Sequence, residues 1–337
     1  MQRMGGVGMP RIGYHCSHEQ FSPGELVRYA QIAEEAGFDL IASSDHFHPW
    51  DNAQGQAGFV WSWLGAAMQA TQLPSSTVSC PGQRYHPAIL AQASATLANM
   101  FPGRFTQCLG SGQYVNEHIT GTGWPRKDVR QQMLRESCEV MRRLWRGEWV
   151  THRGAIVVED AKLYTRPATP PSLIGAAQSI ETAVWMAPWV DGIYTTAQSP
   201  ERDQEFVTAF HGAGGEGKPI WLKVDLSYHP DAEEALRDAY VQWRANAVGR
   251  TLSQELRTPD DCATAAQYIR PEDMTSHVRI SADVEEHLAW LQGDIARGFD
   301  TIVLHNVNRS QELFLRTFGE RVLPVLHADH GTQRRAA

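Results

Sequence analysis

The sequence lacks the features of secreted, membrane-spanning and nucleic-acid-binding proteins. Its 337 residues contain five cysteines, an odd number with no C-x-x-C pair, which does not fit a disulfide framework and indicates a reducing cytoplasm. No stretch approaches the roughly 18 apolar residues of a membrane span, and the first ten residues lack the apolar core of a signal peptide. The formal net charge is −8, whereas a nucleic-acid partner requires a basic face. We therefore expect a cytoplasmic protein without membrane or nucleic-acid partners.

What the sequence does contain is a regular alternation of short apolar runs with segments of helical periodicity. The first helix illustrates it: Ser22, Pro23 and Glu25 form a capping-box start, and Gly37 stands where a left-handed C-terminal residue belongs. Eight strand–helix units without a run of consecutive strands predict an α/β fold, a (β/α)8 TIM barrel. The predicted strands cover residues 11–16, 38–42, 75–80, 104–109, 172–176, 192–196, 218–226 and 300–305.

Two segments interrupt this alternation. Within residues 149–170, Gly154 and the apolar run after it predict a hairpin inserted before the fifth strand. Residues 230–297 are mostly helical and are long enough for the seventh helix and an extra excursion. A helix over 312–326 closes the chain. We predict a single barrel domain over residues 11–326, a flexible N-terminus at 1–10 and a disordered tail at 327–337.

The richest chemistry follows the second predicted strand, where Asp45, His46 and Trp50 emerge together. A histidine exchanges a proton near neutral pH, and an adjacent carboxylate can fix its tautomer. In a barrel of this type the C-terminal ends of the strands carry the chemistry. The other strand ends bring Glu19, residues 77–80 and Gln113 to the same mouth. The alternative is structural: Asp45 caps a turn, and His46 and Trp50 belong to the core.

A metal site is a second alternative, because His46-x-His48 resembles a metal-binding pair. Metal-dependent hydrolases on this fold also use histidines after strands five and six and a carboxylate after strand eight. Those ends read GAAQ at 175–178, TTAQ at 195–198 and HNVN at 305–308, which leaves too few ligands for a catalytic zinc. A metal hydrolase, or a cofactor-binding barrel without turnover, is therefore kept only as an alternative.

The sequence resembles the bacterial luciferase-like superfamily and, within it, the branch of coenzyme F420-dependent dehydrogenases. The resemblance extends from residue 11 to about residue 325. Its most specific motif is Ser-Asp-His-Phe-x-Pro-Trp at residues 44–50, whereas short glycine matches would be weak alone. Further matches lie at residues 13–14, 19–21, 84–87, 110–112, 116–117, 143–145 and 147–148.

The resemblance implies a luciferase-like barrel that transfers a hydride between an alcohol-type carbon and C5 of the deazaflavin. In that family the counterpart of His46 removes the hydroxyl proton, the counterpart of Asp45 contacts the ring, and those of Trp50 and Glu19 line the substrate site. A base and a hydride acceptor must meet at one carbon, which agrees with this arrangement. A non-proline cis peptide bond is implied at Thr77–Val78. The implied cofactor contacts are Asp45, Thr77, Val78, Cys80, Gly112, Gln113, Ala177, Gln178 and Ser179.

Two departures from the family concern the cofactor. The glutamate regarded as a proton donor after strand four is Gln113 here, and an amide can form a hydrogen bond but cannot deliver a proton. The glycine pair that approaches the cofactor phosphate is Ala177-Gln178, although backbone N–H groups from there to Ser179 could still hold a phosphate. Flavin mononucleotide, with monooxygenase activity, is the alternative cofactor within the superfamily.

A third departure concerns the substrate. Sugar-phosphate members carry basic residues after strand six, but none stands between Thr195 and Gln198, and the later arginine aligns with His277, with Arg279 nearby. We therefore expect a homodimeric F420-dependent oxidoreductase that acts on a small molecule other than glucose 6-phosphate. Trp50, Trp61 and Trp63 lie on segments that could wall the mouth and favour a less polar alcohol or ketone. An equally good interpretation of Trp61 and Trp63 is helix core.

Overall fold

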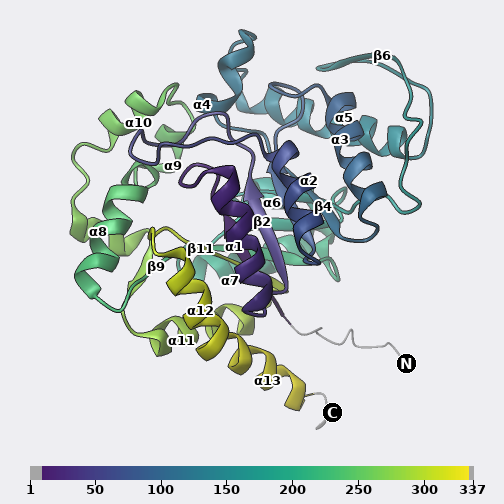
Figure 1. Cartoon of the computed structure of the whole chain (residues 1–337). Helices are drawn as coiled ribbons and strands as arrows, with labels where there is room; N and C mark the ends of the chain where they lie inside the picture. Colours follow the sequence, from purple (N-terminus) through teal and green to yellow (C-terminus); the bar gives the residue numbers. More distant parts are fainter. Residues whose placement is uncertain (1–9, 334–337) are drawn as a thin grey trace.

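The computed structural model describes residues 10–333 and is organised around a closed parallel sheet surrounded by helices (Figure 1). Pairing of β8 with β9 joins the two ends of the strand order, so the predicted (β/α)8 barrel is confirmed. Its strands are β1 (Arg11–Cys16), β2 (Leu40–Ser44), β3 (Ser75–Ser79), β4 (Phe105–Leu109), β7 (Leu173–Ala176), β8 (Gly192–Thr196), β9 (Ile220–Tyr228) and β11 (Thr301–Asn306).

The helices that follow the strands form the outer layer. They are α1 (Pro23–Glu35), α2 (Val60–Ala70), α3 (Pro87–Met100), α5 (Lys127–Trp145), α6 (Ile180–Met186), α7 (Pro200–Phe210), α8 (Ala232–Trp243), α11 (Val284–Ala296) and α12 (Gln311–Arg321). The predicted start of α1 is confirmed: the Ser22 side chain accepts from Glu25 N, and the Glu25 carboxylate accepts from Ser22 N. The predicted left-handed residue after the helix is also present, since Gly37 has φ +88°. Helix α7 was not predicted, although Ser199 and Pro200 form an N-cap and N1 pair typical of a helix start.

Strand register determines which side chains enter the barrel. A small apolar cluster fills the lumen, with Leu40, Cys108, Ile174, Tyr194 and Trp221 among its members. Because side chains alternate along a strand, the next inward positions above Trp221 on β9 are 223 and 225. The outward positions pack instead against the helices in the main core. The lumen is therefore apolar below and polar towards the C-terminal ends of the strands.

The structure has additional elements in both predicted insertions, and the two differ in structure. The first is an antiparallel hairpin of β5 (Val150–Arg153) and β6 (Val157–Ala161), which extends beyond the helix layer (Figure 1). The second follows α8 and contains α9 (Arg250–Ser253), α10 (Pro259–Ala265) and the short strand β10 (Arg279–Ser281), which pairs with the end of β9. A further short helix, α4 (Tyr114–Glu117), follows β4.

The prediction for the C-terminus is wrong in part. Two helices replace the single one expected, because α12 is followed by α13 (Leu323–Gln333), so residues 327–333 are helical rather than disordered. The helix is anchored by the buried side chains of Leu323 and Leu326 and by a contact of His327 Nε2 with Asp39 Oδ2 at 3.1 Å. The predicted flexible N-terminus, except for Pro10, and residues 334–337 lie outside the described residues.

Two further observations concern the described residues as a whole. Within residues 10–333 no helix is both long and apolar enough to cross a membrane. All peptide bonds of that part are trans, so the cis bond implied at Thr77–Val78 is not present in this structure.

The packing of α12 on α1 yields a stability prediction. A Cβ added at Gly319 would stand 2.6 Å from the Ala36 carbonyl oxygen and 3.0 Å from its Cα, both backbone atoms. We expect Gly319→Ala to reduce the free energy of unfolding by roughly 1–3 kcal/mol, as overpacking does. Gly65→Ala in α2 is the matched control, because nothing lies within 4 Å of its new methyl group; it should be neutral or stabilising by up to about 1 kcal/mol. Urea unfolding measures both, and equal stabilities would contradict the prediction.

Candidate active site

Asp45 holds the loop after β2 in place. Its Oδ1 accepts from Arg84 Nη2 at 3.0 Å and Tyr85 OH at 2.8 Å, and its Oδ2 accepts from Ser79 Oγ at 2.5 Å and Trp61 Nε1 at 3.2 Å. A carboxylate offers about four acceptor sites, so this buried side chain is saturated by the protein. The geometry therefore favours a structural role for Asp45 over the ring contact expected from the resemblance.

His46 is paired with Glu19, and not with the adjacent Asp45 that the sequence suggested. His46 Nδ1 lies 2.5 Å from Glu19 Oε1, and Ser17 Oγ donates to the other carboxylate oxygen at 2.8 Å. Burial alone would raise the pKa of Glu19, but His46 reverses this effect and holds the pKa well below its usual range. An ionised Glu19 only accepts, so Nδ1 carries a hydrogen whether the ring is neutral or charged. In the neutral ring, Nε2, which has no hydrogen-bond partner among the described residues, then bears the lone pair.

The backbone beyond His46 is held by α4. Asn116 Oδ1 accepts from Phe47 N at 2.9 Å and from His48 N at 3.0 Å, and His48 Nδ1 lies 2.7 Å from Val115 O. The Asn-Glu motif at 116–117 therefore connects the loop after β4 to the loop after β2. Sequence analysis noted this motif without assigning it a role.

Trp50 covers one side of the mouth. Its ring stands edge-on to His46 at 5.1 Å and packs on a satellite apolar cluster that includes Trp243, Met274 and Val307. This cluster joins α8 and the second insertion to the barrel. The predicted convergence of Glu19, His46 and Trp50 is thus present in the structure.

A further part of the wall is formed by residues that sequence analysis missed. Lys223 and Asp225 on β9 form an ion pair, and Asp225 Oδ1 also lies 2.9 Å from His305 Nδ1 on β11. The ring of His15, from β1, stands 4.6 Å from that of His305. The alternation of inward and outward side chains along β9 would have identified Lys223 and Asp225. A lysine and an aspartate at inward positions of a buried strand are unusual.

The predicted cofactor contacts from β3 and β4 lie close together. Gly112 has φ +77°, and a Cβ there would stand 2.7 Å from Cys80 Sγ and 2.7 Å from Glu117 Cγ. Val78 faces the lumen, whereas Thr77 is turned away from it and donates through Oγ1 to Ser43 O at 3.2 Å. The loop around Gly112 therefore runs directly over the end of β3.

The remaining cofactor candidates lie after β4 and β7. Gln113 occupies the N-cap position of α4 and is half-buried. Ala177 is buried and Gln178 exposed, and Ser179 caps the seven-residue helix α6 by accepting from Thr182 N at 3.3 Å.

The other predicted substrate-binding residues, on the later strands and the second insertion, differ in burial and in their contacts. Arg279 donates to both oxygens of Asp294, at 2.5 and 3.0 Å, and Asp294 is fully buried. This pair attaches β10 to α11, so the guanidinium is engaged in structure. His277 is exposed, Thr195 is buried, and Gln198 is tied through its backbone N to Asp203.

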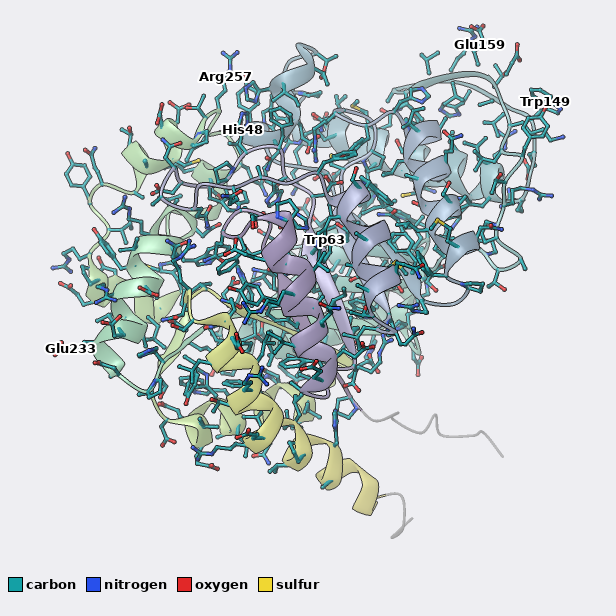
Figure 2. The ribbon with its side chains drawn as sticks, viewed as in Figure 1. His48, Trp63, Trp149, Glu159, Glu233 and Arg257 are labelled. Atoms are coloured by element: carbon teal, nitrogen blue, oxygen red, sulfur yellow. The ribbon has the colours of Figure 1, made fainter. Side chains whose placement is uncertain are left out.

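The two uncertain tryptophans follow the core interpretation. Trp63 is buried, with its ring at 4.8 Å from that of His18, and Figure 2 shows it among the helices beside the barrel. Trp61 packs on Phe105 and donates to Asp45. The mouth is therefore lined by Trp50 and Trp243 rather than by these two.

The mouth is asymmetric in a way that fits a flat, partly polar ring. Along β2, β3, β4 and β7 the inward positions near the strand ends carry the small residues Ser44, Val78, Gly110 and Ala176. The charged groups stand on the other side, on β9 and β11. A ring laid against the small residues would face the His46–Glu19 pair.

A metal-binding arrangement does not emerge from the described ranges. Within residues 10–333, no three His, Cys, Asp or Glu side chains gather as metal ligands. The two histidines of the His46-x-His48 pair are engaged separately, with Glu19 and with Val115 O.

The family follows from comparison with known proteins. A family model described as "Luciferase-like monooxygenase" matches residues 3–301. The chain belongs to this family. Among curated luciferase-like relatives, the F420-dependent glucose-6-phosphate dehydrogenases of Microbacterium testaceum and Nakamurella multipartita are each 34% identical to it, over 327 and 330 residues. Each alignment covers 94% of this chain and 97% of the relative.

Solved structures extend the comparison. An F420-dependent secondary alcohol dehydrogenase, in complex with an F420-acetone adduct, superposes with a TM-score of 0.87 at 30% identity and covers 95% of this chain and 99% of that one. The F420-dependent tetrahydromethanopterin reductase of Methanopyrus kandleri, at 18% identity and a TM-score of 0.75, covers 95% of this chain and 100% of its own and shares the fold.

Glu117 yields a prediction on pH. Burial raises the pKa of this carboxyl to about 7, and Arg84 only partly opposes the rise. Because the folded pKa lies above the unfolded value of about 4.3, the stability linked to this proton is present at low pH and is lost as the pH rises through 7. Glu117→Gln stays neutral, so its stability relative to wild type should increase by roughly 2–3 kcal/mol between pH 4 and pH 8.

Urea unfolding at both pH values measures this difference. The control is Glu139→Gln, since Glu139 is an exposed partner of Arg135 and should show almost no change between the two pH values. A pH-independent effect of Glu117→Gln would contradict the prediction.

Proposed function

We propose that this luciferase-like protein is a coenzyme F420-dependent oxidoreductase that transfers a hydride between an alcohol or carbonyl substrate and the deazaflavin. The observation that carries the proposal is the His46–Glu19 pair at the barrel mouth, in which the second imidazole nitrogen has no partner among the described residues. The 34% identity to F420-dependent dehydrogenases supports the choice of cofactor. F420, when bound, supplies a two-electron hydride acceptor or donor.

His46 acts as the base in the oxidation direction. Its Nε2 accepts the hydroxyl proton of the alcohol, which makes removal of the hydride from the same carbon easier. The imidazolium that results is stabilised by the Glu19 carboxylate on Nδ1. In the reduction direction His46 returns the proton to the carbonyl oxygen. Trp50 excludes water from one side of the imidazole.

The cofactor is proposed to lie against the ends of β3, β4 and β7. Val78, Cys80 and Gly112 would contact its ring, and Thr77 would contribute only its backbone, since its hydroxyl bonds Ser43 O. Gln113 would donate a hydrogen bond to the ring without delivering a proton. The backbone from Ala177 to Ser179 would hold the phosphate.

The substrate is proposed to be a small secondary alcohol or ketone rather than a sugar phosphate. Two cations near the ends of the later strands are each paired with a carboxylate, Lys223 with Asp225 and Arg279 with Asp294. A phosphate dianion requires free charge-assisted donors. The structural relative with an acetone adduct supports the smaller substrate.

The protein is further proposed to be a cytoplasmic homodimer. Phe59, Ile89 and Val157 are each more than half exposed, which is costly for a monomer when such residues lie close together. The consecutive residues Tyr85 and His86 connect two of these side chains. The Phe59 ring lies 6.4 Å from that of Tyr85, and His86 Nε2 lies 2.8 Å from Val157 O. Figure 2 shows Trp149 and Glu159 at the outer edge of the same hairpin. Analytical ultracentrifugation tests the dimer.

The proposed cytoplasmic location has separate support. All five cysteines are free, which is expected in a reducing compartment.

The test of cofactor choice is a direct titration. Oxidised F420 should bind more tightly than flavin mononucleotide, and a secondary alcohol should then bleach its absorbance. Equal or tighter binding of the flavin would instead support a monooxygenase, the activity in the family's description.

The base is tested by His46→Ala. Turnover should fall by roughly 10²–10⁴-fold, the usual contribution of a positioned base, with F420 affinity nearly unchanged. His48→Gln is the neighbouring control, since that ring faces Val115 O and His118, and it should retain near wild-type turnover. A His46→Ala variant with wild-type turnover would remove His46 from the mechanism.

The substrate class is tested with glucose 6-phosphate against 2-propanol. Loss of two charge-assisted contacts weakens binding by roughly 3–6 kcal/mol, about 10²–10⁴-fold, so glucose 6-phosphate should be a poor substrate. Rapid F420 reduction by it, with a micromolar Michaelis constant, would show that Lys223, Arg279 or another cation is released for phosphate binding.

A further inference from the structure

A second histidine, His305, stands in a buried charged network at the same mouth as His46. It extends inward from β11 and contacts Asp225 on β9 and Gln20 after β1. Neither the proposed hydride transfer nor the binding of F420 assigns it a role. Its hydrogen bonds determine how many protons it carries.

The first constraint comes from Gln20. Its Nε2 donates to Val307 O at 2.8 Å and to Gln242 Oε1 at 3.2 Å. A backbone carbonyl can only accept, so the amide orientation of Gln20 is determined by its partner rather than chosen freely. Gln20 Oε1 therefore faces His305 Nε2, at 2.9 Å. Since that oxygen only accepts, His305 Nε2 must carry a hydrogen.

The second constraint comes from Asp225. His305 Nδ1 lies 2.9 Å from Asp225 Oδ1, and the Lys223 ammonium contacts the same carboxylate. Although burial favours the neutral acid, Lys223 and His305 hold the pKa of Asp225 well below its usual range. An ionised carboxylate only accepts, so Nδ1 must carry a hydrogen as well. An imidazole that donates from both nitrogens is the cation.

Burial and the Lys223 ammonium hold the pKa of His305 below its usual range, although Asp225 and Glu19 oppose them. This direction works against the cation, so the assignment of the charge rests on the two acceptors that face the ring nitrogens. His15, on β1, has its ring beside that of His305. Burial and His305 hold the pKa of His15 well below its usual range. From α8, the uncharged Trp243 packs edge-on at 4.5 Å.

The buried charges of this network can be counted. Glu19 and Asp225 are anionic and Lys223 is cationic, so the three side chains carry a net charge of −1. One further proton, on one of the neighbouring histidines, makes the network neutral. Two side chains compete for it, His46 and His305. His46 needs only one hydrogen for its single protein contact, whereas both contacts of His305 need one.

We propose that His305 holds this balancing proton in the resting enzyme, which leaves His46 neutral with Nε2 ready to accept the substrate proton. His305 is a positioning residue in this scheme: it acts on His46 through the field at Glu19 and does not touch the reacting atoms. When the alcohol proton moves to His46 Nε2, His305 keeps its own proton. The inference rests on the proposed role of His46 as the base.

The direct test is the imidazole ¹⁵N spectrum of the protein without cofactor at pH 7. The signals of the 14 histidines are assigned by single substitutions. We expect both His305 nitrogens to be protonated and His46 to be neutral, with its hydrogen on Nδ1. A neutral His305 overturns the proposal whether or not the protein reduces F420. Failure of the proposed function would instead appear as lack of F420 binding, with the spectrum unchanged.

The variant His305→Asn keeps a polar group beside Asp225 without the charge. Removal of a nearby positive charge favours protonation of His46, so a larger fraction of His46 should be protonated in the spectrum at pH 7 than in wild type. The acid limb of the kcat/KM profile should move to higher pH with it. His152→Asn is the matched control, since His152 is paired with Glu136 beside the hairpin, and it should change neither. A folded His305→Asn protein with an unchanged His46 overturns the proposal, and the wild-type spectrum decides if the variant does not fold.

Discussion

The structure depends on the closure of its parallel sheet by the pairing of β8 with β9. A closed parallel barrel directs the C-terminal ends of all its strands to the same mouth. Residues far apart in the chain, such as Glu19 and His305, meet there without a dedicated connection between them. Closure also gives the lumen a dry apolar floor, which makes every charge above it expensive unless it is paired.

The buried charged groups at the mouth of the barrel are accordingly paired. Each carboxylate at the strand ends is engaged by several donors: Asp45 by four side chains, Glu19 by Ser17 and His46, and Asp225 by Lys223 and His305. The same principle applies at the periphery, where Asp294 is held by Arg279 and Arg297. In the His46–Glu19 pair, by contrast, His46 Nε2 has no hydrogen-bond partner among the described residues, which distinguishes it from the engaged carboxylates around it.

Sequence analysis predicted the fold and the convergence of Glu19, His46 and Trp50, because strand periodicity and the location of barrel chemistry are local or general rules. It could not predict which carboxylate would bond His46, since Glu19 and Asp45 are both near the mouth and only side-chain geometry separates them. It missed Lys223 and Asp225 because charged residues in a buried strand contradict the apolar pattern used to find strands. It also placed Arg279 near the substrate, because no local pattern connects this residue of β10 with its partner Asp294, which lies 15 residues further along the chain on α11. The extension of α13 depended on burial of Leu326, which no local signal reveals.

The double contact of Asn116 with the backbone of Phe47 and His48 has a consequence for how such enzymes diverge. The loop after β4, which presents Gly112 and Gln113, is physically attached to the loop that presents His46, the proposed base. A change that reshapes one loop to accept a different ring will displace the other as well. Cofactor choice and acid–base geometry therefore cannot drift independently, and laboratory evolution towards a new redox partner would have to alter both loops together.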